Sequence, residues 1–145
     1  MTSGKKILIV LAVVLISIVL PFSALVGLAI YSHGAATRAG NEAATIQNMK
    51  TIAAVEAEYF ITRNRTYATI DQLVQEQFLS SKFGAHPAVA DGYVLALKLK
   101  SPNGYALTAD PQDRSTGKRH FYLDSASEQI HVNSDGPAGP NDPIL

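Results

Sequence analysis

Residues 41–60, NEAATIQNMKTIAAVEAEYF, carry the pattern that decides how this chain folds. The apolar positions that share one helical stripe are Ile46, Met49, Ala53 and Phe60. Most charged and amide side chains of the stretch fall elsewhere, so one face of the helix is apolar over about five turns. A period of 3.6 residues is typical of an amphipathic helix that covers a core. We therefore expect a helix over residues 32–64 whose apolar stripe packs on the rest of its domain.

An uncharged apolar run precedes this helix. From Ile7 to Tyr31 the chain has 25 residues without a charge. As a helix this run would measure about 37 Å, more than the ~30 Å hydrocarbon core of a bilayer. We predict a single transmembrane helix over residues 7–31. The side chains expected to anchor it among membrane lipids are Ile7, Leu11, Leu15, Leu20, Leu25 and Ile30.

The cations around the run predict its orientation. Lys5 and Lys6 lie just before it, whereas the first fixed cation beyond it is Arg38. An excess of Lys and Arg marks the cytoplasmic side of a membrane span. We expect residues 1–6 in the cytoplasm, a single pass through the cytoplasmic (inner) membrane, and residues 32–145 outside, in the periplasm or the extracellular space.

A cleaved signal peptide is the alternative interpretation of the same run. Gly27-Leu28-Ala29 has the small-x-small pattern of a cleavage site. The apolar segment of a signal peptide is only 7–15 residues long, however, and this run is longer. The length favours the retained anchor.

Beyond the long helix, the pattern predicts a short helix and then a sheet. Thr69 followed three residues later by Gln72 is a capping box, which indicates a short helix over 69–79. Residues 80–92 contain glycine and proline and are expected to form a loop.

Residues 92–133 change to a period of two, which is typical of strands. Ser101-Pro102-Asn103-Gly104 is a turn signal between two alternating runs, and a second hairpin follows. We expect about four antiparallel strands and an irregular tail over 134–145. The fold class is α+β, because the helix stripe covers the apolar face of the sheet. Its core positions in the sheet are expected to be Leu95, Leu97, Leu107, Phe121 and Ile130.

The composition excludes several function classes. The chain of 145 residues has no cysteine, which removes disulfides, thiolate nucleophiles and cysteine zinc sites. The formal net charge is zero and Lys and Arg are scattered, so no nucleic-acid surface is indicated. No phosphate loop, nucleophile elbow or zinc-protease motif occurs. We expect a protein that is not an enzyme, with no cofactor and no small-molecule substrate.

A few titratable residues deserve a separate interpretation. His120 and His131 lie on adjacent predicted strands, but two imidazoles alone do not make a metal site, and we interpret them as exposed strand residues. Asp135, Asp142 and backbone carbonyls of the tail could form a calcium site, although no EF-hand pattern is present. Glu56 and Glu58 are two residues apart and point to different faces of the helix, so we assign them to a solvated surface.

The order of these segments resembles the type IV pilin family, which includes the pseudopilins of type II secretion. The resemblance covers about residues 35–145. The segments that carry it are NEAATIQNMKTIAAVEAEYF, TYATIDQLVQEQFLSS, GYVLALKLKSPNGYALTADP, GKRHFYLDSASEQIHV and the tail SDGPAGPNDPIL. It implies a structural membrane protein with a pilin-like fold, whose partners are pilin or pseudopilin subunits or other proteins of a secretion assembly.

The N-terminus favours an alternative function. Prepilins carry a Gly cleavage site and, shortly beyond it, a Glu. In this chain no acidic residue precedes Glu42, and the only early glycine is Gly4, which Lys5 follows. The alternative is a membrane-anchored periplasmic binding or scaffold domain that uses the fold without polymerising. A membrane-tethered hydrolase would need a His and a carboxylate gathered in a pocket, which the sequence does not indicate.

Overall fold

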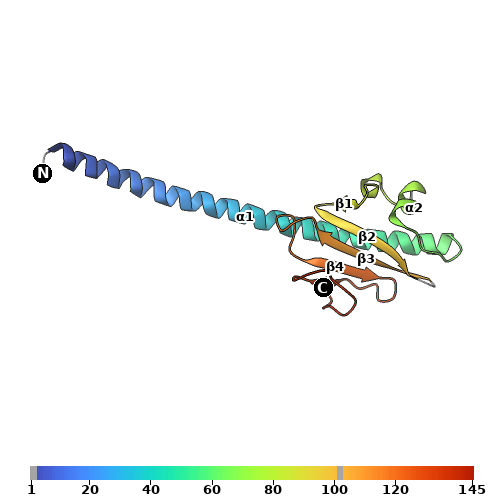
Figure 1. The fold of residues 1–145 in the computed structure, drawn as a ribbon. Helices are drawn as coiled ribbons and strands as arrows, with labels where there is room; N and C mark the ends of the chain where they lie inside the picture. Colours follow the sequence, from blue (N-terminus) through green and yellow to red (C-terminus); the bar gives the residue numbers. More distant parts are fainter. Residues whose placement is uncertain (1–2, 101–102) are drawn as a thin grey trace. The chain divides into compact units, whose positions relative to one another are not determined.

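The computed structural model has an α+β fold in which a long helix precedes a five-stranded antiparallel sheet (Figure 1). The structure describes the backbone of residues 3–100 and 103–145, and the side chains of residues 33–100 and 103–145. The chain divides into two units, Met1–Ala36 and Thr37–Leu145. The second unit contains the sheet, and we call it the head. The α+β class predicted from the sequence is confirmed.

The first element is α1, Ser3–Thr62. It continues through Gly34 and Gly40, since a single glycine weakens a helix by only about 1 kcal/mol relative to alanine. Within the part of the chain whose side chains are described, no helix has the length and apolar character needed to cross a membrane. The predicted anchor residues lie outside that part, in residues 7–31.

The face of α1 that is buried in the head follows steps of three and four residues. Besides Asn48, its fully or nearly buried positions are Glu42, Thr45, Met49, Ile52, Glu56 and Tyr59. We call this set the buried stripe. Ile46 and Ala53, which the sequence analysis placed at the centre, are half-buried and pack against the core beside it. Phe60 is also half-buried, and its ring stacks on Tyr67 with 4.7 Å between the centroids.

The short helix α2 covers Ile70–Gln75. Its capping box is formed, because the Thr69 hydroxyl accepts from Gln72 N and the Gln72 side chain accepts from Thr69 N. The helix ends earlier than residue 79, since Gln77 has a φ of 62° and the chain turns back there. A 3-10 turn, η1, follows at Ser81–Phe83.

The sheet is a meander in which each strand pairs antiparallel with the next. Its strands are β1 (Ala88–Ala90), β2 (Tyr93–Lys100), β3 (Gly104–Pro111), β4 (His120–Asp124) and β5 (His131–Asn133). In the central register, Leu97 lies opposite Leu107, and Leu107 lies opposite Leu123. The predicted turn residues 101 and 102 lie outside the described residues.

The sheet has one strand more than the four expected, because β1 lies in the predicted loop 80–92. Asp91 and Gly92 join β1 to β2, with φ of 51° and 77°. Two successive residues with positive φ form the tight turn that suits the twist of a hairpin. The Asp-Gly pair was therefore the signal for this strand, although β1 itself is too short to show a period.

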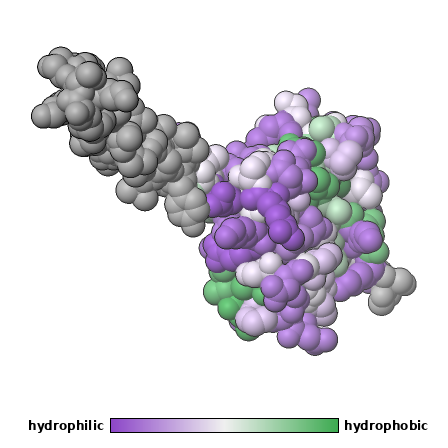
Figure 2. All heavy atoms as spheres, turned by 60° about the vertical axis from the view of Figure 1, so that its left-hand side comes forward, coloured by the Kyte–Doolittle hydropathy of each residue, from purple (hydrophilic) through white to green (hydrophobic). Residues whose placement is uncertain are grey.

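One core joins the sheet to α1, and Figure 1 shows the second half of the helix running along the sheet. The core contains the predicted positions Met49, Leu95, Leu107, Phe121 and Ile130, while Leu97 is half-buried beside it. Figure 2 shows one face of the molecule, where hydrophilic residues cover most of the coloured surface. Hydrophobic residues form smaller separate patches on that face.

The tail over 134–145 is fastened to the edge of the sheet. His131 forms an antiparallel bridge with Ile144. Val132 N donates to Pro143 O at 2.8 Å, and Leu145 N donates to Ile130 O at 2.9 Å. The segment has few regular elements, as expected, but it covers the free edge of β5 and so occupies backbone groups that would otherwise be open to another strand.

Candidate functional site

Glu42 is the centre of a polar clamp between the start of α1 in the head and the loop that joins β3 to β4. Its Oε1 accepts from the backbone N–H groups of Lys118 and Arg119, at 3.0 and 3.3 Å. Its Oε2 accepts from Arg119 Nε at 2.7 Å. Burial alone would raise the pKa of Glu42, but these donors and the charge of Arg119 outweigh it and lower the pKa. Glu42 is therefore a buried carboxylate that stays ionised.

Two further contacts hold the same loop in place. Asn41 Nδ2 donates to Thr116 O at 2.9 Å, and the Tyr93 hydroxyl donates to Arg119 O at 2.9 Å. Gly117 lies against the Tyr93 ring, where an added Cβ would sit only 2.0 Å from the phenol oxygen. A glycine is needed here because the backbone approaches the ring so closely. We call Asn41, Glu42 and residues 116–119 the Glu42 clamp.

A cleft of about 610 Å³ with several charged lining residues opens beside the Glu42 clamp. Its charged lining residues are Glu42, Asp113, Arg114, Lys118, Arg119 and Asp135. Three carboxylates thus face three fixed cations, and Asp113 already accepts from Ser115 and Thr116 of its own loop. The cleft has no excess of either charge with which to select an ion.

A second hollow, of about 420 Å³, is mostly apolar and lies between α1 and the tail. Ala53, Ala54 and Ala57 of the helix line it, together with Ile144 and Leu145 of the tail. The two tail side chains are 57% and 52% exposed. Small side chains allow another backbone to approach a helix closely, so this groove suits an apolar segment better than a polar ligand.

Glu56 lies deeper than any other charged side chain described in the head, with no solvent exposure. Its Oε2 accepts from Ala68 N at 3.1 Å, whereas Oε1 has no hydrogen-bond partner among the described residues. Burial raises the pKa of Glu56 to about 7. The expectation that Glu56 lies on a solvated face is wrong, because the buried stripe passes through residue 56; Glu58 is exposed as expected.

Glu76 fastens the end of α1 to the end of α2. Its Oε1 accepts from the Tyr59 hydroxyl at 2.9 Å, and its Oε2 accepts from Arg63 Nε at 2.9 Å. The Tyr59 and Arg63 hydrogen bonds lower the pKa of Glu76. This exposed carboxylate therefore acts as a charged link between the two helices.

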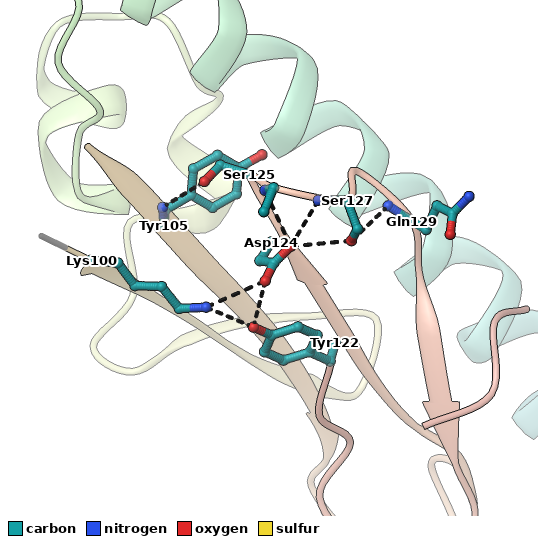
Figure 3. A network of polar contacts seen from close by, with 8 residues as sticks. Lys100, Tyr105, Tyr122, Asp124, Ser125, Ser127 and Gln129 are labelled. Atoms are coloured by element: carbon teal, nitrogen blue, oxygen red, sulfur yellow. Dashed lines mark hydrogen bonds and ion pairs between the residues drawn. The ribbon is translucent and has the colours of Figure 1, made fainter. Parts of the chain in front are cut away.

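Asp124 organises a polar network on the sheet (Figure 3). Its Oδ2 accepts from the Tyr122 hydroxyl at 2.9 Å and from Lys100 Nζ at 3.3 Å. Its Oδ1 accepts from Ala126 N, Ser127 N and the Ser127 hydroxyl. Burial raises its pKa, but the Ser127, Tyr122 and Lys100 hydrogen bonds outweigh it and lower the pKa to about 2. An acid this strong remains ionised, so the network stabilises β2, β4 and the following turn rather than exchanging protons.

The two strand histidines have separate partners. His120 Nδ1 contacts Asp110 Oδ1, and His131 Nδ1 contacts Asp142 O at 2.7 Å. In the register, His131 lies opposite Tyr122 rather than opposite His120. The expectation of exposed residues is wrong for both, since His120 is half-buried and His131 is only 8% exposed because the tail covers it.

Asp142 supports the conformation of the tail. Asp142 Oδ1 accepts from Asn133 Nδ2 at 3.2 Å, and Oδ2 accepts from Gly139 N at 2.7 Å. In residues 33–100 and 103–145, no group of three or more His, Asp or Glu side chains could hold a metal ion. The calcium hypothesis relies on backbone carbonyls beside Asp135 and Asp142, and it stays a prediction.

The sequence analysis missed Glu42 and Glu56 as site residues. A signal was present, since the positions 42, 45, 49, 52, 56 and 59 follow alternating steps of three and four residues, as in a helix seam. Hydropathy alone skips the polar members of that series, whose partners lie elsewhere in the chain.

Comparison of the chain with protein-family models, with curated proteins and with solved structures finds no match. The functional argument therefore rests on the fold, on the contacts of the head and on the sequence pattern.

Proposed function

We propose that this chain is a structural, pilin-like or pseudopilin-like membrane protein linked to a type IV pilus or a type II secretion assembly. One observation carries the proposal: a helix covers a five-stranded antiparallel sheet, in a chain where an uncharged run of 25 residues precedes the head. In this proposal residues 7–31 anchor the protein in the cytoplasmic membrane and the head lies outside the cytoplasm. The protein catalyses no reaction and needs no cofactor.

The way α1 is fastened to the sheet supports a structural role. The Glu42 clamp holds the start of the helix in the head, and Glu76 holds its last turn through Tyr59 and Arg63. The core residues of the buried stripe lie between these two points. A subunit that is held in an assembly by its helix needs such a connection, because force on the helix must reach the head without unfolding it.

The apolar groove is the surface where we expect a neighbouring subunit. Lys50 and Glu128 provide opposite charges beside the three alanines and the exposed tail residues. Further surfaces that partner proteins could contact are the exposed parts of residues 80–92 and 110–117 and the outer face of the sheet.

The intact mass of the protein from its native membranes tests the proposal. Loss of a few N-terminal residues together with a gained methyl group would be the processing expected of a pilin. Loss of about 29 residues would indicate signal cleavage after Ala29 and would overturn the membrane anchor. Release from membranes by high salt without detergent would also contradict an anchor.

A non-polymerising tethered domain is the second candidate. The absence of an acidic residue before Glu42 favours it, since an assembling pilin uses an early Glu. A charge buried in lipid is costly without a partner. The early Glu of a pilin therefore has a role only during assembly. Sheared surface fibres distinguish the two candidates: incorporation supports the pilin-like subunit, whereas a full-length mass and absence from fibres support the tethered domain.

A further inference from the structure

Glu56 joins α1 to the segment that connects it to α2. This segment, residues 63–69, is called the connection below. The carboxyl group accepts one hydrogen bond from the connection, donated by Ala68 N at 3.1 Å, and its other oxygen has no partner among the described residues. Ala68 is itself fully buried. Among the described residues, this completely buried acid therefore has its one polar contact with the connection. That hydrogen bond lowers the pKa of Glu56, but burial outweighs it.

The ionisable groups around Glu56 give it no compensating positive charge. The pKa of Tyr59 on α1 is raised mainly by its hydrogen bond to Glu76, and that of Tyr105 on β3 mainly by burial; the negative charge of Glu56 is a further cause at both. Tyr67 of the connection packs edge-on against Tyr105, 5.0 Å between centroids, and Asp124 and Glu128 also act on Tyr105. In residues 33–100 and 103–145, no Lys, Arg or His forms a hydrogen bond or ion pair with Glu56. An ionised carboxylate cannot remain in such a place without water or a cation.

The first part of the connection, residues 63–66, is more open to solvent than the buried stripe, whereas Tyr67 is half-buried and Ala68 is buried. Asn64 and Arg65 have φ of 51° and 59°, a left-handed conformation that is unfavourable for residues other than glycine. Residues 63–66 are exposed. Their backbone bonds are short-range, from Arg65 N to Phe60 O and from Thr66 N to Arg63 O. Exposed segments with few buried contacts open locally at a lower free energy than a helix in the core.

We propose that Glu56 is a pH-operated latch, which holds the connection on the core as a neutral acid and releases it when the carboxyl group loses its proton to solvent. The pKa of about 7 that burial gives Glu56 places this change near neutral pH. Above that pH the carboxylate is hydrated through the opened connection. The latch does not depend on whether the chain enters a pilus or a secretion assembly.

Hydrogen exchange at the Ala68 amide tests the latch directly, because this N–H is the donor to Glu56. The full-length protein in detergent micelles is measured from about pH 5.5 to about pH 8.5, with each rate corrected for intrinsic exchange. We expect protection of residues 66–70 to fall at least about tenfold across this range, as a carboxyl shift of more than one pKa unit requires.

Two variants separate the latch from general effects of pH. Glu56→Gln keeps a carbonyl acceptor for Ala68 N but cannot ionise, so its protection should stay constant. Glu58→Gln removes the same charge from an exposed neighbour on α1, and it should behave like the unmodified protein. Constant protection in the unmodified protein would overturn the proposal, as would an equal loss in Glu56→Gln.

A second measurement keeps the proposal testable if Glu56→Gln does not fold. Carboxyl ¹³C shifts of glutamate-labelled protein report the titration of each glutamate without any substitution. One glutamate that titrates near neutral pH, together with loss of protection over the same pH range, supports the latch. Titration of every glutamate near the ordinary value of about 4.3 would overturn it.

Discussion

Glu42 and Glu56 lie on the same buried stripe of α1, about four turns apart, and both are shielded from solvent. Glu42 accepts three hydrogen bonds, two from backbone N–H groups and one from Arg119. Glu56 accepts one, from Ala68 N. The pKa of Glu42 is lowered and that of Glu56 is raised.

The difference shows that burial does not by itself determine the charge of a carboxyl group. Desolvation raises the pKa at both positions. At the Glu42 end, the loop between β3 and β4 supplies a cation and two amide donors, which favour the charged form. At the Glu56 end, the connection supplies only one donor, so the neutral acid is favoured. One end of the stripe is a permanent ionic clamp and the other responds to pH.

The largest expected effect concerns the pH dependence of stability at the Glu56 end. The pKa of Glu56 is raised in the folded state, so the native protein binds a proton that the unfolded chain releases. Stability should therefore fall as pH rises from about 4.5 to about 7, by at most about 3 kcal/mol, and should stay level above that.

Urea unfolding of the full chain in micelles at several pH values measures this slope. The difference between Glu56→Gln and the unmodified protein should grow over that pH window in favour of the variant. Glu58→Gln serves as the control and should follow the unmodified protein. A difference that does not change with pH would mean that the pKa of Glu56 is the same in the folded and the unfolded protein, which would contradict the shift.

The second expected effect concerns the loop between β3 and β4, which places Arg119 beside Glu42. Gly117→Ala would place a Cβ 2.0 Å from the Tyr93 phenol oxygen and 2.6 Å from Cζ. Because such overpacking forces the loop outward, we expect a loss of about 2–3 kcal/mol in the free energy of unfolding. Gly136→Ala is a matched control, since a Cβ there meets nothing within 4 Å. Equal effects of both changes would contradict the close approach at Gly117.

The third expected effect comes from removing the cation beside Glu42, so that Glu42, like Glu56, has no positively charged partner. Arg119→Met removes the cation but retains an apolar side chain over Phe121, whose ring lies 5.6 Å from the guanidinium carbon. We expect the free energy of unfolding to fall by about 2 kcal/mol. This is less than for a fully buried ion pair, because the Arg119 side chain is 39% exposed. Denaturant unfolding of the variant and the unmodified protein measures this difference. Arg114→Met, an exposed change in the same loop, should alter stability by less than about 0.5 kcal/mol.

The smallest expected effect concerns Thr45, a third polar residue of the buried stripe. The hydroxyl of Thr45 is buried and has no hydrogen-bond partner in the described part of the chain. Thr45→Val replaces the hydroxyl by a methyl group of similar shape, so we expect the free energy of unfolding to rise by about 1 kcal/mol. Thermal or denaturant unfolding measures this change. Thr51→Val is the control, because Thr51 is exposed and its hydroxyl donates to Gln47 O. A loss of stability at position 45 would show that the hydroxyl has a partner.

Local signals predicted much of the fold. The helical period of residues 41–60, the capping box at Thr69 and the alternation along β2 and β3 each depend on residues that are close in sequence. Such signals act through backbone preferences and through side chains on one face of one element. They identified the helix, the main hairpin and five of the predicted core positions without any knowledge of pairing.

Elements that depend on distant partners were not predicted. β1 has three residues, and it becomes a strand through its pairing with β2. The tail is ordered by its bridge to His131, which buries that ring. Short segments carry too few side chains to show a period, so the partner strand decides their conformation.

What the sequence by itself determined is therefore the order and type of the main elements, and a series of positions on α1 that face the core. It also placed glutamates in that series at residues 42 and 56. Tertiary structure decided their different chemistry. Arg119 is 77 residues from Glu42, whereas Ala68 is 12 residues from Glu56. The pKa of a buried acid reflects the balance between desolvation and nearby donors, and only the folded chain brings those donors to the carboxyl group.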